Sequence, residues 1–221
     1  MVLNMLSKFY HPLALHNFVM ALPEEAVVLD VGCGNNSPSR IKAARPDLKV
    51  MGIDIQDISD HRVLEKFIKT SPGEFAEAIL DIGKVDAVIS NHNIEHVEME
   101  LREKVIENMC LILKNDGLFF LATPAFRSKY LPSRGGSLNY YDDESHQGQP
   151  LRKLWLCKRI ENQGLKIMSC RSSYHPFLLR LQGLKNEIKS IKTNRVLDGT
   201  WGLYGFEQII WAKKSIAIKI N

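Results

Sequence analysis

Between residues 27 and 124, short apolar runs alternate with stretches of helical periodicity, and this alternation constrains the fold more than any other feature. Strands that are buried on both faces of a parallel sheet read as continuous apolar runs, whereas connecting helices show a period of about 3.6 residues. The alternation therefore predicts an α/β fold: a doubly wound, mostly parallel sheet with helices on both faces.

Turn residues bound the apolar runs and give the expected limits of each element. The expected strands are residues 27–31, 48–53, 76–80, 87–90, 118–122, 164–170 and 204–213. The expected helices are residues 7–21, 37–45, 63–68, 95–113, 151–162 and 176–192. Residues 124–150 show neither period and are rich in Gly, Ser, Tyr and Asp, so we expect a long functional loop there.

The composition is that of one ordinary globular domain. The chain has 221 residues, of which 45% are hydrophobic and 24% charged, and it is expected to form a single domain over residues 1–221 with an N-terminal helical cap at residues 1–23. The first apolar stretch, residues 18–22, is too short to span a bilayer, and no signal peptide precedes it. A cytoplasmic location without stable membrane insertion is expected. The four cysteines form no CxxC pair, which argues against a zinc knuckle or a disulfide framework.

A glycine-containing loop follows the first expected strand. In the stretch VLDVGCGNNSP, Gly32 and Gly34 come directly after the apolar run. Ligands of open α/β sheets bind at the carboxyl ends of the strands, and glycines allow the backbone to turn sharply and approach a ligand closely. Asp54 ends the second expected strand 20 residues after Gly34, which is the usual spacing for a carboxylate that accepts ribose hydroxyls. The alternative for Asp54 is a turn residue in DIQD.

Two asparagines distinguish this loop from a dinucleotide-binding loop. A pyrophosphate needs a third glycine and a bare helix N-terminus, but Asn35 and Asn36 occupy that space, and Ser37 with Pro38 begins the next helix. Asparagine tolerates left-handed backbone and offers a polar side chain. The loop therefore favours a nucleoside with a zwitterionic tail over NAD.

Four motifs that occur in order resemble those of class I S-adenosylmethionine-dependent methyltransferases. They are VLDVGCG, GID, DAVISNHNIEHVE and LILKNDGLFFLATP, and together they extend to residue 124. The resemblance implies a Rossmann-like, seven-stranded sheet with an antiparallel last strand, which YGFEQIIWAK would supply. It also implies S-adenosyl-L-methionine as the cofactor.

The resemblance implies positions for the cofactor-binding residues as well. The methionine end would lie against Asp30, Gly32 and Gly34, with Asn35 and Asn36 beside them, and the ribose against Asp54 and Ile55. The sulfonium would lie beside Ser90, Asn91 and His92. The family often places an Asp after the third strand to contact the adenine, and Asp81 is the candidate here. The segment AILDIGKVD departs from the family pattern because it is short and lacks the Leu-Pro that usually follows.

Methyl transfer to oxygen or nitrogen requires alignment with the donor and removal of a proton, and alignment alone can supply roughly 7–11 kcal/mol. In SNHNIEHVE, His92, Glu95 and His96 lie at i, i+3 and i+4 at the cofactor end of the sheet. His92 is a candidate base that Glu95 would orient; the alternative is that Glu95 and His96 only pack and cap a helix. Some quinone O-methyltransferases carry acidic residues and a His in the similar stretch. Because three ligands on one turn rarely complete a coordination shell, no metal is expected.

A second polar cluster lies in RGGSLNYYDDESHQGQP, residues 134–150. The fold usually builds its acceptor site after the fifth strand, and the cluster offers groups that hydrogen-bond hydroxyls and amines. His146 is the second candidate base. The alternative is a self-packed loop in which Asp142 and Asp143 cap the next helix. With GTWGLYGFEQIIWAKK, this stretch resembles, more loosely, bacterial methyltransferases associated with sugar or cell-surface glycan modification.

The net charge of +4 is concentrated near the C-terminus. Residues 180–195 carry five basic residues and one acidic residue, and 5 − 1 = +4 equals the excess of the whole chain. Residues 176–195 are expected to form a basic amphipathic helix that can act as a lid. Its basic side is compatible with a phosphorylated sugar, an anionic lipid surface or plain solvation. Its apolar stripe consists of Phe177, Leu181, Leu184, Ile188 and Ile191.

The expected function is methyl transfer to oxygen or nitrogen of a small polar acceptor, with sugars and glycan precursors included. A nucleic-acid substrate is less favoured, because SNHN stands where an NPPY-type or DPPY-type tetrapeptide would be, and the charge excess is small. The alternative from another class is a catalytically inactive cofactor-binding module that regulates or scaffolds a partner. The sequence leaves the oligomeric state open.

Overall fold

The computed structural model describes residues 14–174 and 177–215, with the side chains of residues 177–182 outside the description. The strands are β1 (Val27–Val31), β2 (Lys49–Asp54), β3 (Lys66–Lys69), β4 (Val85–Asn91), β5 (Leu113–Pro124), β6 (Leu165–Ser172) and β7 (Glu207–Lys214). The helices are α2 (Ala14–Met20), α3 (Ser37–Ala44), α4 (Phe75–Leu80), α5 (Met99–Leu111), α6 (Lys153–Asn162), α7 (Phe177–Thr193) and α8 (Thr200–Tyr204).

The strands form one seven-stranded sheet in the order β3-β2-β1-β4-β5-β7-β6. Strands β1 to β5 pair with one another in parallel, whereas β7 is antiparallel to both β5 and β6. The predicted Rossmann-like sheet with an antiparallel last strand is therefore confirmed. The strand order reverses between β1 and β4, which is where open α/β sheets bind their ligands.

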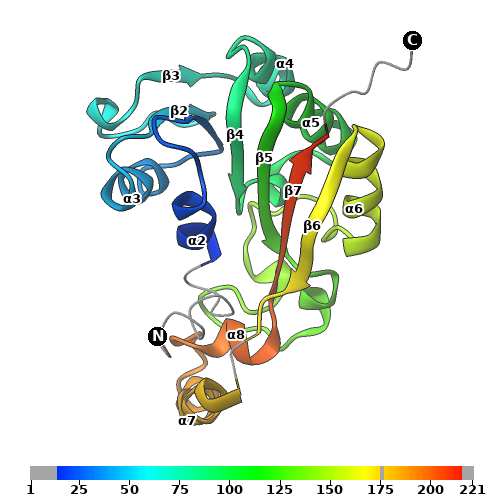
Figure 1. Cartoon of the computed structure of the whole chain (residues 1–221). Helices are drawn as coiled ribbons and strands as arrows, with labels where there is room; N and C mark the ends of the chain where they lie inside the picture. Colours follow the sequence, from blue (N-terminus) through cyan, green and yellow to red (C-terminus); the bar gives the residue numbers. More distant parts are fainter. Residues whose placement is uncertain (1–13, 175–176, 216–221) are drawn as a thin grey trace.

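Helices cover both faces of the sheet, as Figure 1 shows. One apolar cluster joins α4, α5 and α6 to the sheet, and a second joins α2 and α3 to the opposite face. Alternate residues of β1 serve the two clusters: Val28 packs in the second, and Leu29 and Val31 pack in the first. The continuous apolar run that predicts β1 thus reflects burial on both faces.

Two elements between β2 and β4 differ from the sequence prediction. Residues 63–68 are not a helix: a short 3-10 turn at His61–Val63 leads into β3. Residues 76–80 are not a strand but the larger part of α4. The four-residue edge strand β3 is half-exposed, so it lacks a continuous apolar pattern. The segment of α4, FAEAIL, is rich in Ala and Glu, which favour helices and are depleted in strands.

Smaller differences concern element limits. The predicted helix at residues 7–21 is described from Ala14 to Met20, and the rest lies outside the described residues. Helix α3 has Asn36 rather than Ser37 at its N-cap. The 3-10 turn Ile94–His96 separates the predicted helix start from α5, and the short helix α8 was not predicted. Among the described residues, no helix is long and apolar enough to cross a membrane.

The long segment between β5 and α6 is a loop with two short 3-10 turns, Phe126–Tyr130 and Tyr140–Asp142. Figure 1 shows this loop, α7 and α8 beyond the carboxyl ends of β4 and β5. Two cysteines that are distant in sequence also meet: the Sγ atoms of Cys157 on α6 and Cys170 on β6 are 2.8 Å apart, and both are free thiols.

Candidate active site

A cavity of about 490 Å³ lies where β1, β2 and β4 end. Its size is within the usual range for small-molecule sites. One set of lining residues follows β2 and β3: Asp54, Ile55, Gln56, Pro72 and Phe75. A second set follows β1 and β4: Gly32, His92, Asn93 and His96. The loop after β5 adds Ser145 and Gln147.

The glycine loop is shaped by left-handed backbone. Gly32 has φ +68° and Gly34 has φ +53°, a region that favours glycine. A Cβ atom on Gly32 would lie 2.1 Å from the side chain of Asn93, whereas a Cβ atom on Gly34 would meet nothing within 4 Å. The amide N–H of Gly34 donates a hydrogen bond of 2.8 Å to Asp54 Oδ2. Asp54 therefore holds the loop and also lines the cavity.

Asp30 is a buried carboxylate at the end of β1. It is 1% exposed, and among the described residues neither of its oxygens has a hydrogen-bond partner. Burial raises the pKa of Asp30 to about 7; the nearby Ser37 hydroxyl lowers it, and the charge of Asp54 adds to the rise. An unpaired buried carboxylate is costly. Asp30 is not among the residues that line the cavity.

The two asparagines of the loop do not line the cavity. Asn35 Oδ1 accepts a hydrogen bond of 2.6 Å from the Ser59 N–H, so its side chain fastens the loop to the segment after β2. Asn36 forms the N-cap of α3 without a side-chain cap hydrogen bond. The structure thus places both residues beside the glycine loop but not among the residues that face the cavity.

Asp81 lies away from the cavity, which corrects the adenine position expected for it. It follows α4, and its carbonyl accepts from Lys66 Nζ, at the first residue of β3. Asp81 therefore lies at the amino-terminal edge of the sheet, whereas the cavity lies at the carboxyl edge. The error follows from the misassigned third strand. Pro72 and Phe75, which come after β3, line the cavity where Asp81 was expected.

The residues expected beside the sulfonium end β4. Ser90 is fully buried, with no hydrogen-bond partner for its hydroxyl among the described residues. Asn91 is the last residue of β4, and His92 follows with φ +54°. Ile55, expected at the ribose, lines the cavity and is 44% exposed.

His92 lies between two buried carboxylates. Its Nδ1 is 3.0 Å from Glu95 Oε1, and its Nε2 is 2.6 Å from Glu207 Oε1. Burial alone would lower the pKa of His92, but the hydrogen bonds and charges of Glu207 and Glu95 outweigh it and raise the pKa to about 10. Both ring nitrogens therefore carry protons at neutral pH. This arrangement does not suit the base role expected for His92.

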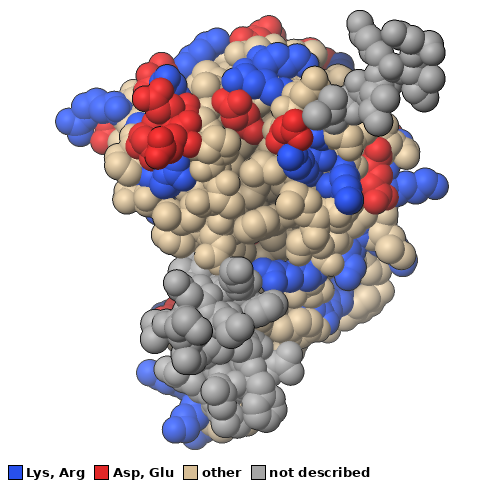
Figure 2. All heavy atoms as spheres, viewed as in Figure 1, with Lys and Arg blue, Asp and Glu red and all other residues tan. Residues whose placement is uncertain are grey.

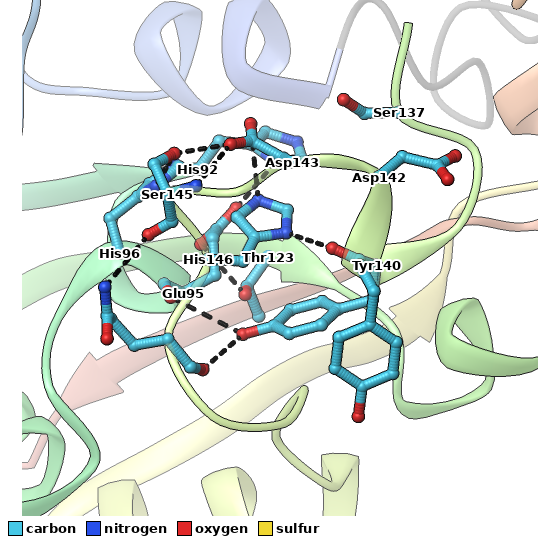
Figure 3. A network of polar contacts seen from close by, with 12 residues as sticks. His92, Glu95, His96, Thr123, Ser137, Tyr140, Asp142, Asp143, Ser145 and His146 are labelled. Carbon is cyan, nitrogen blue, oxygen red and sulfur yellow. Dashed lines mark hydrogen bonds and ion pairs between the residues drawn. The ribbon is translucent and has the colours of Figure 1, made fainter. Parts of the chain in front are cut away.

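His146 differs from His92 because, among the described residues, a hydrogen-bond partner lies at only one of its ring nitrogens, Nδ1. Its side chain is 6% exposed, and its Nδ1 lies 2.6 Å from the Tyr140 carbonyl, which can only accept. The neutral imidazole therefore carries its proton on Nδ1 and its lone pair on Nε2. Asp143 Oδ2 lies 3.8 Å from Nε2, which is too far for a hydrogen bond. The ring stacks on Tyr140 and lies beside His96, which lines the cavity (Figure 3).

Glu95 and Arg102 connect these histidines to the scaffold. Glu95 Oε2 accepts 3.0 Å from Thr123 Oγ1 on β5, while its Oε1 faces His92. The guanidinium of Arg102 is 1% exposed and donates to four backbone carbonyls and to the Tyr140 hydroxyl. Those carbonyls belong to Glu95, Val97, Gln147 and Gln149. Arg102 thus binds the turn after β4 and the loop after β5 to the same helix, α5.

Most of the polar loop after β5 packs against itself. Asp142 Oδ2 accepts from three backbone N–H groups, and Asn139 and Asp142 form a capping box. Arg134 forms a buried ion pair with Glu187 of α7. The self-packed alternative therefore describes Asp142 and Asn139, although the cap is on the loop's own 3-10 turn and not on α6. Asp143 instead accepts from Ser145.

Three candidate metal ligands lie together: one donor atom each of Glu95, His96 and His146 lies within 4.8 Å of the others. The sequence prediction of no metal considered only the turn that holds His92, Glu95 and His96. His146 comes from a loop that sequence spacing does not connect to that turn. Both oxygens of Glu95 are already hydrogen-bonded to His92 and Thr123, so the carboxylate has few lone pairs left for an ion.

Sequence reasoning missed several residues of the site. Gln56, Phe75 and Asn93 line the cavity, and Glu207 pairs with His92 from the start of β7. Trp201 of α8 lies over His92 with ring centroids 5.5 Å apart. Asn93 stands inside the motif used for His92, so it could have been found. Glu207 and Trp201 carry no local signal, because only the antiparallel return of β7 brings them to the end of β4.

Comparisons with known proteins agree with this fold. A family model described as "Methyltransferase domain" matches residues 7–172. A methyltransferase from Archaeoglobus fulgidus described as SAM-dependent is 21% identical, with 91% of each chain covered and a TM-score of 0.58. A putative S-adenosylmethionine-dependent methyltransferase from Listeria monocytogenes is 17% identical, with 91% of this chain and 96% of that chain covered and a TM-score of 0.58.

A third solved structure was determined with bound ligands. It is the Burkholderia thailandensis 1,6-didemethyltoxoflavin-N1-methyltransferase with 1,6-didemethyltoxoflavin and S-adenosylhomocysteine, which is 13% identical, with 92% of this chain and 76% of that chain covered and a TM-score of 0.54. A search of curated protein sequences finds no match.

The fold and the cavity define a class I S-adenosylmethionine-dependent methyltransferase. The chain belongs to the methyltransferase-domain family, whose model covers most of its length. The cavity at the β1/β4 switch point, with the left-handed Gly32 and the carboxylate of Asp54 in its lining, fits a cofactor that carries a ribose.

Proposed function

We propose that the protein transfers the methyl group of S-adenosylmethionine to an oxygen or nitrogen of a small polar acceptor, with sugars included, and that His146 is the general base. The arrangement of His146 carries the proposal. It combines a buried imidazole, a carbonyl that fixes the proton on Nδ1, and an Nε2 lone pair next to a cavity-lining histidine. A hydroxyl is a weak acid and a protonated amine is no nucleophile, so an O–H or N–H acceptor must give its proton to such a group as it is methylated.

The cofactor would be held by the residues that the structure places around the glycine loop. Asp54 retains lone pairs beyond its bonds to the N–H groups of Gly34 and Gln56, so it can accept ribose hydroxyls. Asp30 would receive the amino group, and Gly32 would allow close approach of the methionine end. When bound, S-adenosylmethionine supplies a methyl group activated by its sulfonium.

The acceptor would lie between the loop at residues 124–150 and α8. His146 Nε2 would take the proton from the acceptor as the new bond to the methyl group forms. Asp143 Oδ2, 3.8 Å away, would then stabilise the resulting imidazolium. His92 would act as a positioning residue, because it fixes the ends of β4 and β7 through Glu95 and Glu207. Residues 176–195 would act as a lid over the bound acceptor.

The test is a methyl-transfer screen with isotope-labelled S-adenosylmethionine against sugars, nucleotide sugars, alcohols and amines. We expect transfer to an O–H or N–H acceptor. His146→Ala should lower kcat/KM by about 10²–10⁴-fold while leaving S-adenosylhomocysteine affinity unchanged by calorimetry. The exposed His16 of α2, replaced by Ala, is the matched control and should have no effect.

Two results would contradict the proposal. One is transfer only to carbon or sulfur acceptors. The other is a His146→Ala enzyme with the activity of the wild type on an O–H or N–H acceptor. If the wild type does not bind S-adenosylhomocysteine, the proposed methyl transfer is wrong as a whole. Asp54→Ala should abolish this binding, which would identify the cavity as the cofactor site.

A further inference from the structure

Helix α7 exposes a row of large apolar side chains. Leu184, Ile188 and Ile191 are 52%, 54% and 60% exposed, although they lie on one side of the helix at i, i+4 and i+7. Exposed apolar groups are common singly, but a row of three on one helix indicates a surface that binds something apolar. Among the described residues, no other element packs over this row.

One side of α7, next to the apolar row, is fixed to the protein. Glu187 is 4% exposed, forms an ion pair of 2.5 Å with Arg134 and accepts 2.7 Å from the Tyr204 hydroxyl of α8. Ser190 is fully buried and accepts from Arg134. These contacts set the rotation of the helix about its axis. The apolar row is therefore held outward by the buried side and does not result from a free rotation.

Lysines lie directly beside the apolar row. Lys185, Lys189 and Lys192 are exposed, and none of them forms an ion pair with a described residue. At 100° per residue they occupy one flank of the row, and the buried side of the helix occupies the other. The single acidic residue of the helix, Glu187, is buried against Arg134. The outer surface of α7 is therefore apolar and positive, with no negative charge.

From this surface we propose that α7 binds the protein peripherally to the surface of an anionic lipid bilayer. Apolar residues next to lysines on one helix suit insertion at the boundary of headgroups and acyl chains, with the ammonium groups at the anionic headgroups. An antiparallel, two-fold symmetric contact with a second copy would put both lysine flanks on the same side of the pair, which like charge disfavours. Figure 1 places α7 at one end of the molecule, apart from the sheet, and Figure 2 shows basic side chains at that end.

The same end of the molecule holds the active site. Helix α7 packs on α8, whose Trp201 lies over His92. Attachment through α7 would therefore bring the loop at residues 124–150 close to the lipid surface. The binding itself does not depend on the proposed methyl acceptor, so it can be tested without any activity measurement.

The experiment is flotation of the full chain with two kinds of vesicle, phosphatidylcholine alone and phosphatidylcholine with phosphatidylglycerol. We expect binding to the mixed vesicles that is lost at high salt, and at least about tenfold weaker binding to the neutral vesicles. The triple variant Lys185→Gln, Lys189→Gln, Lys192→Gln should weaken binding by about a hundredfold. The triple variant Leu184→Ser, Ile188→Ser, Ile191→Ser should also abolish it.

The control carries the same kinds of substitution on another helix. Leu154 and Lys158 are exposed at i and i+4 on α6, and Leu154→Ser with Lys158→Gln should leave vesicle binding unchanged. S-adenosylhomocysteine affinity should be the same in all variants, which shows that they are folded. No binding of the wild type to the anionic vesicles would overturn the proposal, as would undiminished binding of the lysine variant. A dimer in light scattering that the serine variant dissociates would overturn it in favour of a second copy.

Discussion

Asp30 lowers the stability of the ligand-free protein when its carboxyl is ionised. Its carboxyl is buried, has no hydrogen-bond partner among the described residues, and has its pKa raised to about 7 from 3.8. A carboxyl whose folded pKa is raised contributes stability that is complete below its unfolded pKa, declines above it, and is lost as the pH rises through about 7. At pH 8 the folded protein therefore holds an unfavourable buried charge.

We predict that Asp30→Asn stabilises the free protein and weakens cofactor binding. At pH 8, urea denaturation should show an increase of about 1–3 kcal/mol in the free energy of unfolding, because the buried charge is gone. Calorimetry with S-adenosylhomocysteine should show about tenfold or more weaker binding, because a charge-assisted hydrogen bond to the amino group is lost. Asp116→Asn, at an exposed carboxyl paired with Lys213, is the control and should change neither quantity. A less stable variant with normal affinity would contradict this role.

The charge of His92, unlike that of Asp30, stabilises the folded protein. Its pKa is raised from 6.5 to about 10, so the stability it provides is complete below about pH 6.5, declines above it, and is lost as the pH rises through 10. His92→Gln should lower the free energy of unfolding by about 3–5 kcal/mol at pH 6.5, because two buried carboxylates lose their cation. The difference between wild type and variant should shrink steadily up to pH 9.5. Titrating groups other than His92, Glu95 and Glu207 cancel in that difference, and a constant difference would show that His92 is neutral.

The sequence identifies these residues with unequal success. Asp30, Asp54 and His92 belong to motifs that end strands, and the register of a parallel sheet brings such residues to one edge whatever the details of packing. Their protonation could not be predicted, because it depends on partners such as Glu207, which lies 115 residues after His92. His146 was found as a candidate from its loop, but its tautomer depends on the Tyr140 carbonyl, which only the folded loop supplies.

At the scale of elements, the loop after β1 offers a matched pair of substitutions. Gly32 and Gly34 both have positive φ, so alanine at either position should cost about 1–2 kcal/mol of backbone strain. Only at Gly32 would the new Cβ also meet Asn93, at 2.1 Å, whereas Gly34 has open space. The free energy of unfolding of Gly32→Ala should therefore be about 1–3 kcal/mol lower than that of Gly34→Ala. Thermal and urea denaturation of both variants measure the difference, and equal losses would show that Asn93 moves away at no cost.

The errors at element scale concern the segment from residue 61 to residue 81. A four-residue edge strand and a six-residue helix are both too short for periodicity to separate them. The elements β1, β4, β5 and α5 were predicted because burial imposes a continuous or periodic pattern on them. This exchange of strand and helix also led to the prediction of Asp81 at the carboxyl edge of the sheet, whereas it lies at the amino-terminal edge.

At the scale of the whole molecule, two parts of the chain build the cavity and the proposed acceptor side, and the loop at residues 124–150 contributes to both, because its Ser145 and Gln147 also line the cavity. Strands β1 to β4 supply the glycine loop and the residues around it. The loop at residues 124–150, α7 and α8 lie beyond the carboxyl ends of the strands and meet at the buried ion pair of Arg134 with Glu187, to which Tyr204 also donates. The side chains of this pair are 7% and 6% exposed, so neither charge can be left alone without a large penalty.

Glu187→Gln should therefore separate the two parts. Arg134 would remain buried without its carboxylate, which costs about 3–5 kcal/mol, and α7, α8 and residues 133–143 should open together. Hydrogen exchange should become faster in these segments and stay unchanged in β1 to β4. S-adenosylhomocysteine affinity should change by less than about threefold, while the KM for the acceptor rises. The double variant Arg134→Met, Glu187→Met removes both charges and should restore slow exchange, because an apolar pair of similar volume often replaces a buried ion pair without loss. Faster exchange across β1 to β4 in Glu187→Gln, with a parallel loss of cofactor affinity, would instead mean that the sheet and the acceptor side fold as one cooperative unit.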